Sequence, residues 1–232
     1  MRHILIIFSV FLFSLTIISC KSSTSSTTST DNSTTTGLFV AVGQSGTILT
    51  SSEGTTWTER TSGISEYLNG VTYGNGLFVT VGYSGTILTS SEGTSWTERT
   101  SGISKLLNEV TYGNSIFVTV GQSGTVLTSS DGTTWTSRTS GTTEDLYGGA
   151  TYGNSIFVTV DYRGTILTSS DGTTWTVRIT GTWWNLNEVT YGNGLFVTVG
   201  NSGIIYTSPD GNSWTTRTTG TSNHLEGVTY SQ

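Results

Sequence analysis

Short runs of β-branched and aromatic residues alternate with polar turns along most of this chain, and the pattern repeats about every 39 residues. One complete copy reads LNGVTYGN, GLFVTVG, SGTILTSSEG and TSWTERTSG, which predicts four short strands separated by Gly, Asn and Ser. Two aromatic series mark the copies at spacings of 39, 39, 40 and 39 residues: Phe39, Phe78, Phe117, Phe157, Phe196 and Trp57, Trp96, Trp135, Trp175, Trp214. One such unit cannot bury its apolar face alone, so this period indicates a propeller or a solenoid.

The two ends of the repeat array favour a closed ring. The first copy starts at Gly37 with the second run, whereas residues 225–230 (LEGVTY) are a first run without the rest of its copy. The sequence therefore predicts an all-β, five-bladed β-propeller of four-stranded blades, closed by the C-terminal strand joining the N-terminal blade. An open solenoid would need capping repeats, which neither end shows. The remaining alternative is a larger ring shared with another chain.

The segment before the repeats has the pattern of an export signal. A basic start at residues 1–3 precedes an apolar run at 4–18, which is too short to span a bilayer. The tetrapeptide at 17–20 (IISC) resembles a bacterial lipobox, which implies that Cys20 carries the lipid; an ordinary signal peptide with an incidental cysteine is the alternative. Residues 21–36 are nearly all Ser and Thr and predict a disordered tether, which leaves 37–232 as the propeller domain.

Charge and composition exclude several kinds of function. The net charge is -6, and removal of the signal takes away Arg2, so that 8 basic residues face 15 acidic ones. This balance argues against nucleic acid binding, which needs a basic surface. Outside the signal, His224 is the lone histidine, and no cluster of ligands has the spacing of a metal site, so neither a metal nor a cofactor is predicted.

A carboxylate beside a glycine follows the third run of every copy. In a tight turn the carboxylate accepts backbone N–H bonds and the glycine supplies a positive φ, which predicts a structural role for these residues: Glu53, Glu92, Asp131, Asp171, Asp210. With the Trp three residues after the Gly, the turn resembles the Asp-box (BNR) repeat of sialidase-like propellers, Ser-x-Asp-x-Gly-x-Thr-Trp. The chain also resembles bacterial propellers related to the photosystem II assembly factor. Here Asp and Gly are adjacent, and Glu replaces Asp in two copies, so the resemblance implies the fold but not the activity.

The repeated arginines argue against catalysis. They stand three residues after each Trp, so the five-fold repeat spreads them around the ring as parts of the outer strands: Arg60, Arg99, Arg138, Arg178, Arg217. Arg163 is the one arginine whose position the other copies do not share, and one arginine cannot form the triad that a sialidase-like site uses. We therefore predict no catalytic residues and no enzyme activity. A sialidase-like glycoside hydrolase is the alternative.

The copies differ most at two connections, which an up-and-down blade places on one face. One joins successive blades (64–69, 103–108, 142–148, 182–187, 221–226), and the other joins the second and third runs. The predicted ligand-binding residues lie there: Trp183, Trp184, Asp161, Tyr162, Arg163, Tyr67, Tyr83, Tyr147. Charged residues are interspersed among them: Lys105, Glu144, Asp145, His224. Aromatic side chains beside polar groups suit sugars, peptides or a protein surface.

These patterns predict a monomeric binding or adhesion protein of the bacterial cell envelope. We expect it to face the periplasm or the exterior, to bind a protein or a carbohydrate, and to touch the membrane through its N-terminal lipid only. A scaffold role in the envelope is an alternative.

Overall fold

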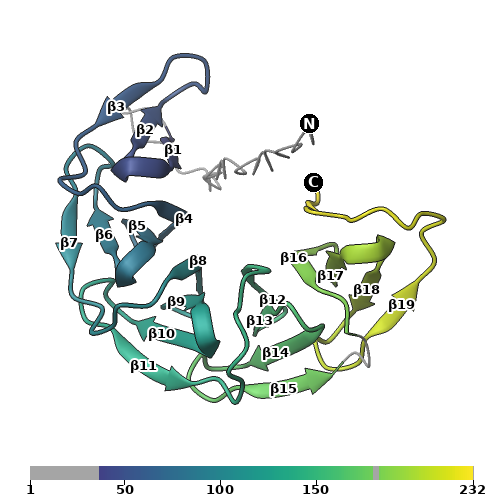
Figure 1. Ribbon diagram of the computed structural model, residues 1–232. Helices are drawn as coiled ribbons and strands as arrows, with labels where there is room; N and C mark the ends of the chain where they lie inside the picture. Colours follow the sequence, from purple (N-terminus) through teal and green to yellow (C-terminus); the bar gives the residue numbers. More distant parts are fainter. Residues whose placement is uncertain (1–36, 180–182, 232) are drawn as a thin grey trace, which may run out of the picture.

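A computed structural model describes residues 37–179 and 183–231. These residues form five antiparallel sheets that stand side by side around an arc (Figure 1). We call the sheets blades 1 to 5 in chain order. The predicted signal, Cys20 and the tether lie outside the described residues. No described helix is long and apolar enough to cross a membrane.

Blades 2 to 5 have four strands each, and blade 1 has three. Blade 1 contains β1 (Phe39–Val42), β2 (Ile48–Ser51) and β3 (Thr58–Arg60). Blade 2 contains β4 (Leu68–Gly74), β5 (Leu77–Gly82), β6 (Ile87–Ser90) and β7 (Thr97–Arg99). Blade 3 contains β8 (Leu107–Gly113), β9 (Ile116–Gly121), β10 (Thr125–Ser129) and β11 (Thr136–Thr139). Blade 4 contains β12 (Ala150–Gly153), β13 (Ile156–Val160), β14 (Thr165–Ser169) and β15 (Thr176–Ile179). Blade 5 contains β16 (Leu186–Gly192), β17 (Leu195–Gly200), β18 (Ile205–Ser208) and β19 (Thr215–Arg217).

The core is divided into four hydrophobic clusters, one at each junction between neighbouring blades. At the first junction Val40 and Ile48 of blade 1 pack with Leu68 and Val71 of blade 2. The other three clusters repeat the arrangement between blades 2 and 3, 3 and 4, and 4 and 5. Each blade therefore gains its stability from its neighbours, as the repeat predicts.

The two variable connections lie on one face, as predicted from the strand order. The N–H of Gly46, in the short helix η1 (Gln44–Gly46), donates to the carbonyl of Glu66 in the connection between blades 1 and 2, at 2.7 Å. The N–H of Tyr83, which begins η2 (Tyr83–Gly85), donates to the carbonyl of Tyr67 at 2.9 Å. We call this side the variable face. On the opposite, uniform face, the amide of Asn114 donates to the carbonyl of Ser170 in the carboxylate turn of the next blade.

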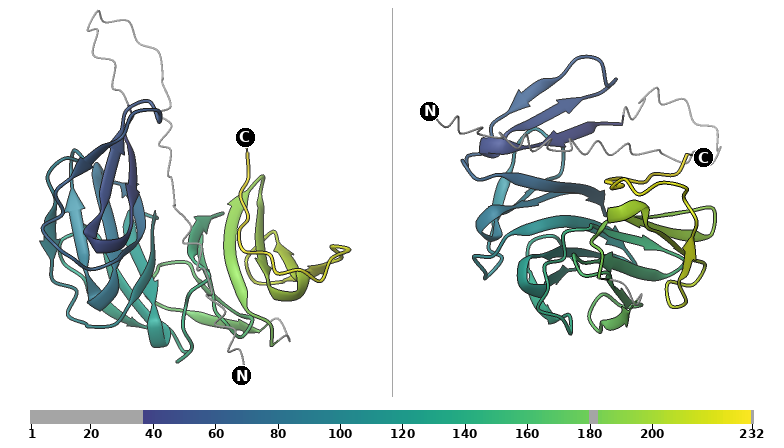
Figure 2. Two further views of the ribbon diagram at one scale, coloured as in Figure 1. Left: turned by 45° about the horizontal axis from the view of Figure 1, so that its top comes forward. Right: turned by 45° about the vertical axis from the view of Figure 1, so that its right-hand side comes forward.

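Closure of the ring is not observed. Residues 225–230 form no strand, and β1 pairs with β2 alone among the described residues. The N–H of Leu225 instead donates to the carbonyl of Gly200 at 3.1 Å, as that of Leu68 does to Gly43 at 3.0 Å. The segment thus packs on blade 5 in the place of a following blade's first strand, apart from β1 (Figure 1 and the left view of Figure 2). Closure stays a prediction.

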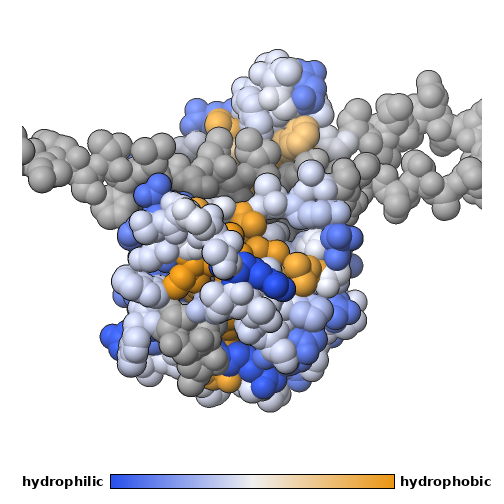
Figure 3. Space-filling model, turned by 90° about the vertical axis from the view of Figure 1, so that its right-hand side faces the viewer, coloured by the Kyte–Doolittle hydropathy of each residue, from blue (hydrophilic) through white to orange (hydrophobic). Residues whose placement is uncertain are grey.

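Both ends of the arc expose residues that the inner blades bury. Val197 and Ile205 of blade 5 are partly exposed, whereas Val79 and Ile87, at the same places in blade 2, are fully buried. On the side of the molecule that faces the viewer in Figure 3, hydrophobic residues form a short band among hydrophilic ones. The end faces of the arc therefore retain apolar surface that a further junction would remove from water.

Candidate functional site

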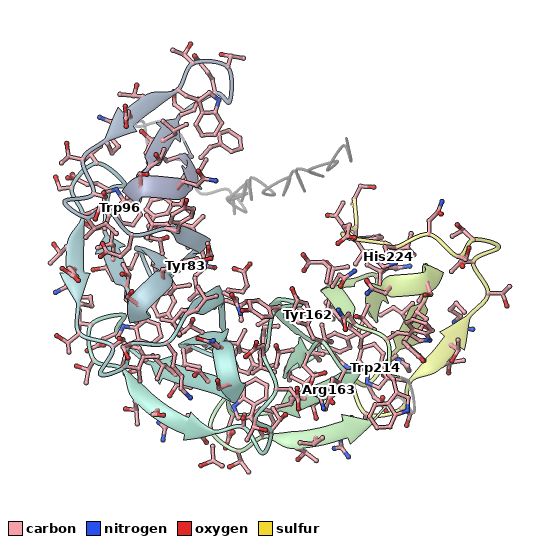
Figure 4. All side chains as sticks on the ribbon, in the orientation of Figure 1. Tyr83, Trp96, Tyr162, Arg163, Trp214 and His224 are labelled. Carbon is pink, nitrogen blue, oxygen red and sulfur yellow. The ribbon has the colours of Figure 1, made fainter. Side chains whose placement is uncertain are left out.

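Four tyrosines of the variable face form two ring pairs. The ring centroids of Tyr67 and Tyr83 are 5.1 Å apart, and those of Tyr147 and Tyr162 are 4.5 Å apart. Each pair joins the connection that enters a blade to the loop between that blade's second and third strands, in blade 2 and in blade 4. Figure 4 places Tyr83 and Tyr162 toward the concave side of the arc. The structure thus brings together four of the predicted binding residues.

The two pairs share one electrostatic environment. Burial raises the pKa of Tyr147, and the negative charge of Asp145 and the neighbouring Tyr162 and Tyr83 raise it further. Burial also raises the pKa of Tyr162, with added effects from Asp145 and Glu226. Tyr83 of the first pair thus contributes to the raised pKa of Tyr147 in the second. Asp145 thus affects both tyrosines of the second pair.

Asp161 stabilises the loop that carries Tyr162 of the second pair. It is fully buried, and its Oδ1 accepts the N–H groups of Arg163 and Thr165, both at 2.8 Å. The other four blades have a glycine there, and at Gly82 an added Cβ would lie 1.9 Å from the carbonyl oxygen of Tyr67. The connection that enters blade 4 is one residue longer than the others. Asp161 therefore has a structural role, although its Oδ2 is buried without a hydrogen bond.

The remaining predicted site residues are Arg163, Trp183 and Trp184. Arg163 forms an ion pair with Glu144, with Nε and Oε2 3.1 Å apart, and lies farther from the concave side than Tyr162 (Figure 4). Trp183 is 85% exposed and Trp184 is 52% exposed, in the connection between β15 and β16. That the two tryptophans bind a ligand stays a prediction.

Two glutamates on the innermost strands were not among the predicted site residues. Glu109 of β8 and Glu188 of β16 stand at the same place in their blades, where blades 2 and 4 have Gly70 and Gly149. Each carboxylate turns back over the glycine of the preceding blade: an added Cβ would lie 2.8 Å from Glu109 Oε1 at Gly70, and 2.9 Å from Glu188 Oε1 at Gly149. The alternation of Gly and Glu within the repeat is the signal that could have revealed them.

Both glutamates hold their protons more tightly than an exposed carboxyl group. Burial raises the pKa of Glu109 to about 8, the N–H of Val110 opposes the rise, and the charge of Glu188 adds to it. Burial raises the pKa of Glu188 to about 7, against the N–H of Val189. Glu188 thus contributes to the raised pKa of Glu109, although the two residues belong to different blades. Perturbed carboxyl groups of this kind are candidates for a functional site.

The carboxylate turns have the structural geometry predicted for them in three of five copies. Oδ1 of Asp131 accepts the N–H groups of Thr133 and Thr134 at 2.8 and 2.9 Å, which holds its pKa far below the usual range. Asp171 and Asp210 make the equivalent bonds. Glu92, one methylene longer, accepts the hydroxyls of Thr94 and Ser95 instead. For Glu53 the described bonds include its own N–H but no contact of its carboxylate.

The tryptophans and arginines of the repeats are also structural. Every repeat Trp donates its indole N–H to the carbonyl of the turn glycine, at 2.9 to 3.1 Å. Nε of every repeat arginine bonds a threonine hydroxyl on the neighbouring strand, at 2.8 to 3.4 Å. These arginines lie on the outermost strands and do not converge. Among the described residues no group of three or more His, Cys, Asp or Glu could hold a metal ion.

Comparison with known proteins shows likeness at the level of the fold. No family model and no curated protein matches the chain. A solved structure titled YCF48 bound to D1 peptide superposes with a TM-score of 0.62 at 19% identity, over 82% of this chain and 63% of that one. YCF48 from Cyanidioschyzon merolae gives 0.58 at 15%, over 77% and 67%. The GH74 enzyme of Niastella koreensis gives 0.60 at 23%, over 77% and 28%. The WD40 β-propeller domain of Doa1 gives 0.60 at 14%.

The fold is a β-propeller. The propeller spans 63% of the first of these structures, and at such identities the likeness says nothing of activity. The neighbours include a peptide-bound protein and an enzyme, so they do not decide between binding and catalysis.

The raised pKa of Glu109 predicts a pH-dependent stability. An unfolded glutamate releases its proton near pH 4.5, whereas the folded one keeps it to about pH 8, so the folded state binds more protons between these values. Stability must therefore fall as the pH rises through this window. We expect Glu109→Gln, which removes the titration, to raise Tm at pH 8 by roughly 2–4 °C or more and to leave it unchanged at pH 4. Thermal melts at both pH values measure this, with Glu98→Gln on the exposed strand β7 as the control. An equal effect at pH 4 and 8 would contradict it.

Proposed function

We propose that this protein is a non-catalytic binding propeller of a bacterial cell envelope, and that its variable face binds a segment of another protein. The observation that carries the proposal is the gathering of Tyr67, Tyr83, Tyr147 and Tyr162 into two ring pairs on the face where the repeats differ. Tyrosine offers large contact area with few rotatable bonds and a hydroxyl for hydrogen bonding, which suits protein recognition.

The arrangement of the face supports binding more than structural maintenance. Tyr83 and Tyr162 are 43% and 41% exposed, so these rings are available to a ligand while they contact their partners. The loops that carry them are held by backbone hydrogen bonds to the neighbouring connection, which fixes the surface in advance of binding. One structural neighbour was solved with a peptide bound, which supports a peptide ligand for a propeller of this shape.

Binding measurements on the mature chain test this function. We expect a random dodecapeptide library to yield ligands, and the double variant Tyr147→Ala, Tyr162→Ala to weaken them by about 30-fold, equivalent to roughly 2 kcal/mol. The double variant Trp183→Ala, Trp184→Ala tests the exposed tryptophans in the same assay. Glu53→Ala, in a turn of the uniform face, is the control and should leave affinity unchanged.

Two results would overturn the proposal. One is the absence of peptide ligands together with binding to a glycan array, which would identify a carbohydrate as the ligand. The other is an unchanged affinity in both aromatic variants at equal thermal stability, because the ligand would then bind elsewhere.

A glycoside hydrolase is the second candidate, and the carboxyl groups of Glu109 and Glu188 are the observation that favours it. Glycosidases use two carboxyl groups, one protonated and one ionised, so the environment must separate their pKa values. Here burial raises the pKa of both, to about 8 and about 7, which fits that division poorly. Hydrolysis of an oligosaccharide that is lost in both Glu109→Gln and Glu188→Gln would establish the enzyme.

We propose that a lipid on Cys20 holds the protein at the membrane, on the strength of the IISC tetrapeptide after the apolar run. A diacylated cysteine supplies two acyl chains, and two such chains are enough for stable membrane anchoring. We expect Cys20→Ala to abolish palmitate labelling and to move the protein out of the detergent phase. Unchanged labelling would refute the anchor.

We also propose that residues 225–230 pair with β1, which would complete blade 1 and bury the exposed end faces. The register of blade 2, in which Val71 pairs with Thr80, then predicts that Val228 pairs with Ala41. Ser231 opposes this closure: it stands where the other blades have a glycine beneath the tyrosine of the next blade, here Tyr73.

A disulfide distinguishes the ways in which the ring could close. In a Cys20→Ala background, we expect Val228→Cys with Ala41→Cys to form an intrachain disulfide upon oxidation, since paired strands bring their Cα atoms within about 5.5 Å. Val228→Cys with Leu49→Cys is the control, because Leu49 lies one strand farther out. Disulfide-linked dimers would indicate a ring shared by two chains, and no disulfide beyond the control would refute both forms of closure.

A further inference from the structure

The aromatic pairs and the carboxylates alternate around the arc. Blades 2 and 4 carry the tyrosine pairs, and where Tyr83 and Tyr162 begin the loop between the second and third strands, blades 3 and 5 have Gln122 and Asn201. Blades 3 and 5 instead carry Glu109 and Glu188 on their innermost strands. Tyrosine pairs and glutamates therefore succeed each other in the order pair, carboxylate, pair, carboxylate.

Each glutamate side chain reaches back to the preceding blade, which carries a tyrosine pair. Glu109 leans over Gly70, which is three residues from Tyr67, and Glu188 leans over Gly149, which is two residues from Tyr147. Glu109 pairs with Val120 and Glu188 with Val199, each directly after a β-bulge near the end of the strand that meets the variable face. The result is two units of one composition: a tyrosine pair with a carboxylate on the next blade.

The two units use tyrosines from different positions of the repeat, so their common composition is not a simple consequence of the repeated sequence. Tyr67 precedes Leu68, whereas Tyr147 follows Leu146, because Tyr147 lies in the longer connection that enters blade 4. The N–H groups of Leu68 and Leu146 nevertheless make the same bond to the preceding blade, to Gly43 and Gly121. The longer connection that enters blade 4 thus places Tyr147 against Tyr162, at a sequence position different from that of Tyr67 in blade 2.

The surroundings specify the charge of the group that such a unit can accept. The faces of tyrosine rings attract cations, and a partly buried carboxylate that lacks a cationic neighbour is stabilised by one. Asp145 and Glu226 add negative charge beside Tyr162, and the guanidinium of Arg163 is engaged by Glu144. Lys105 and His224, the other basic residues of these connections, are both exposed.

We infer that the two units are a pair of subsites for the basic side chains of a protein segment, each holding one lysine or arginine between a tyrosine pair and the glutamate of the next blade. This inference rests on the proposed function and names its ligand: an extended peptide with two basic residues, spaced to reach alternate blades. A bound cation would favour the ionised form of Glu109 and Glu188, whose protons burial otherwise retains to about pH 8 and about pH 7, whereas a neutral or acidic peptide would gain no such attraction.

Selection from the dodecapeptide library tests the inference separately from the proposed function. We expect the selected peptides to be enriched in pairs of Lys or Arg at a fixed spacing. Replacing both basic residues of a selected peptide by glutamine should weaken binding at least tenfold, and the affinity of the basic peptide should fall as salt is raised. The double variant Glu109→Gln, Glu188→Gln should weaken the basic peptide by a similar factor and leave its glutamine version unaffected.

The other possible outcomes would overturn either the cationic subsites alone or the proposed function as well. Peptides that bind without basic enrichment, or glutamine versions that bind as tightly, would overturn the cationic subsites and leave the binding function standing. The absence of any peptide ligand would overturn both. The double variant Glu59→Gln, Glu98→Gln, on the outermost strands β3 and β7, is the matched control for loss of two negative charges, and equal weakening by this variant would reduce the effect to net charge alone.

Discussion

The contact that the whole arc depends on is a tyrosine ring lying directly on a glycine of the preceding blade. An added Cβ would lie 2.0 Å from Cγ of Tyr112 at Gly74, 2.1 Å from that of Tyr152 at Gly113, and 2.1 Å from that of Tyr191 at Gly153. No other residue permits this distance, so the glycine sets how closely successive innermost strands approach. That spacing in turn brings neighbouring sheets into contact over their hydrophobic clusters. It also places a side chain of one blade over the backbone of the preceding blade.

The same close approach explains the carboxylates. Glu109 and Glu188 can turn back over the preceding blade because Gly70 and Gly149 leave room for them, as the tyrosines lie over other glycines. A glutamate in every blade would lack this room, since at Gly70 an added Cβ would also lie 2.9 Å from Cα of Glu109. Carboxylates on alternate blades are therefore the densest arrangement that this geometry accepts without strain.

The features that all five copies share could be predicted from the sequence, whereas features that depend on differences between copies could not. Strand order, the two faces, the aspartate turns and the outer-strand arginines follow from comparing five copies, because each is a local consequence of strand and turn chemistry. The pairing of Tyr147 with Tyr162 does not follow, because an inserted residue and a buried Asp161 redirect one loop. Glu109 and Glu188 could not be recognised, because their environment depends on the glycine of the preceding blade and not on their own strand. The openness of the arc depends on angles between sheets, which no local pattern contains.

The alternation of tyrosine pairs and carboxylates makes two blades the smallest unit that carries a complete subsite. Tyr83 and Tyr162 stand 79 residues apart, as do Glu109 and Glu188. Duplicating a single blade would place two tyrosine pairs or two glutamates on neighbouring blades and would not add a complete subsite. Duplicating two successive blades would lengthen the recognised surface by one subsite. A designer who wishes to extend this protein's reach along a ligand should therefore count in pairs of repeats, even though each repeat folds against its neighbours one at a time.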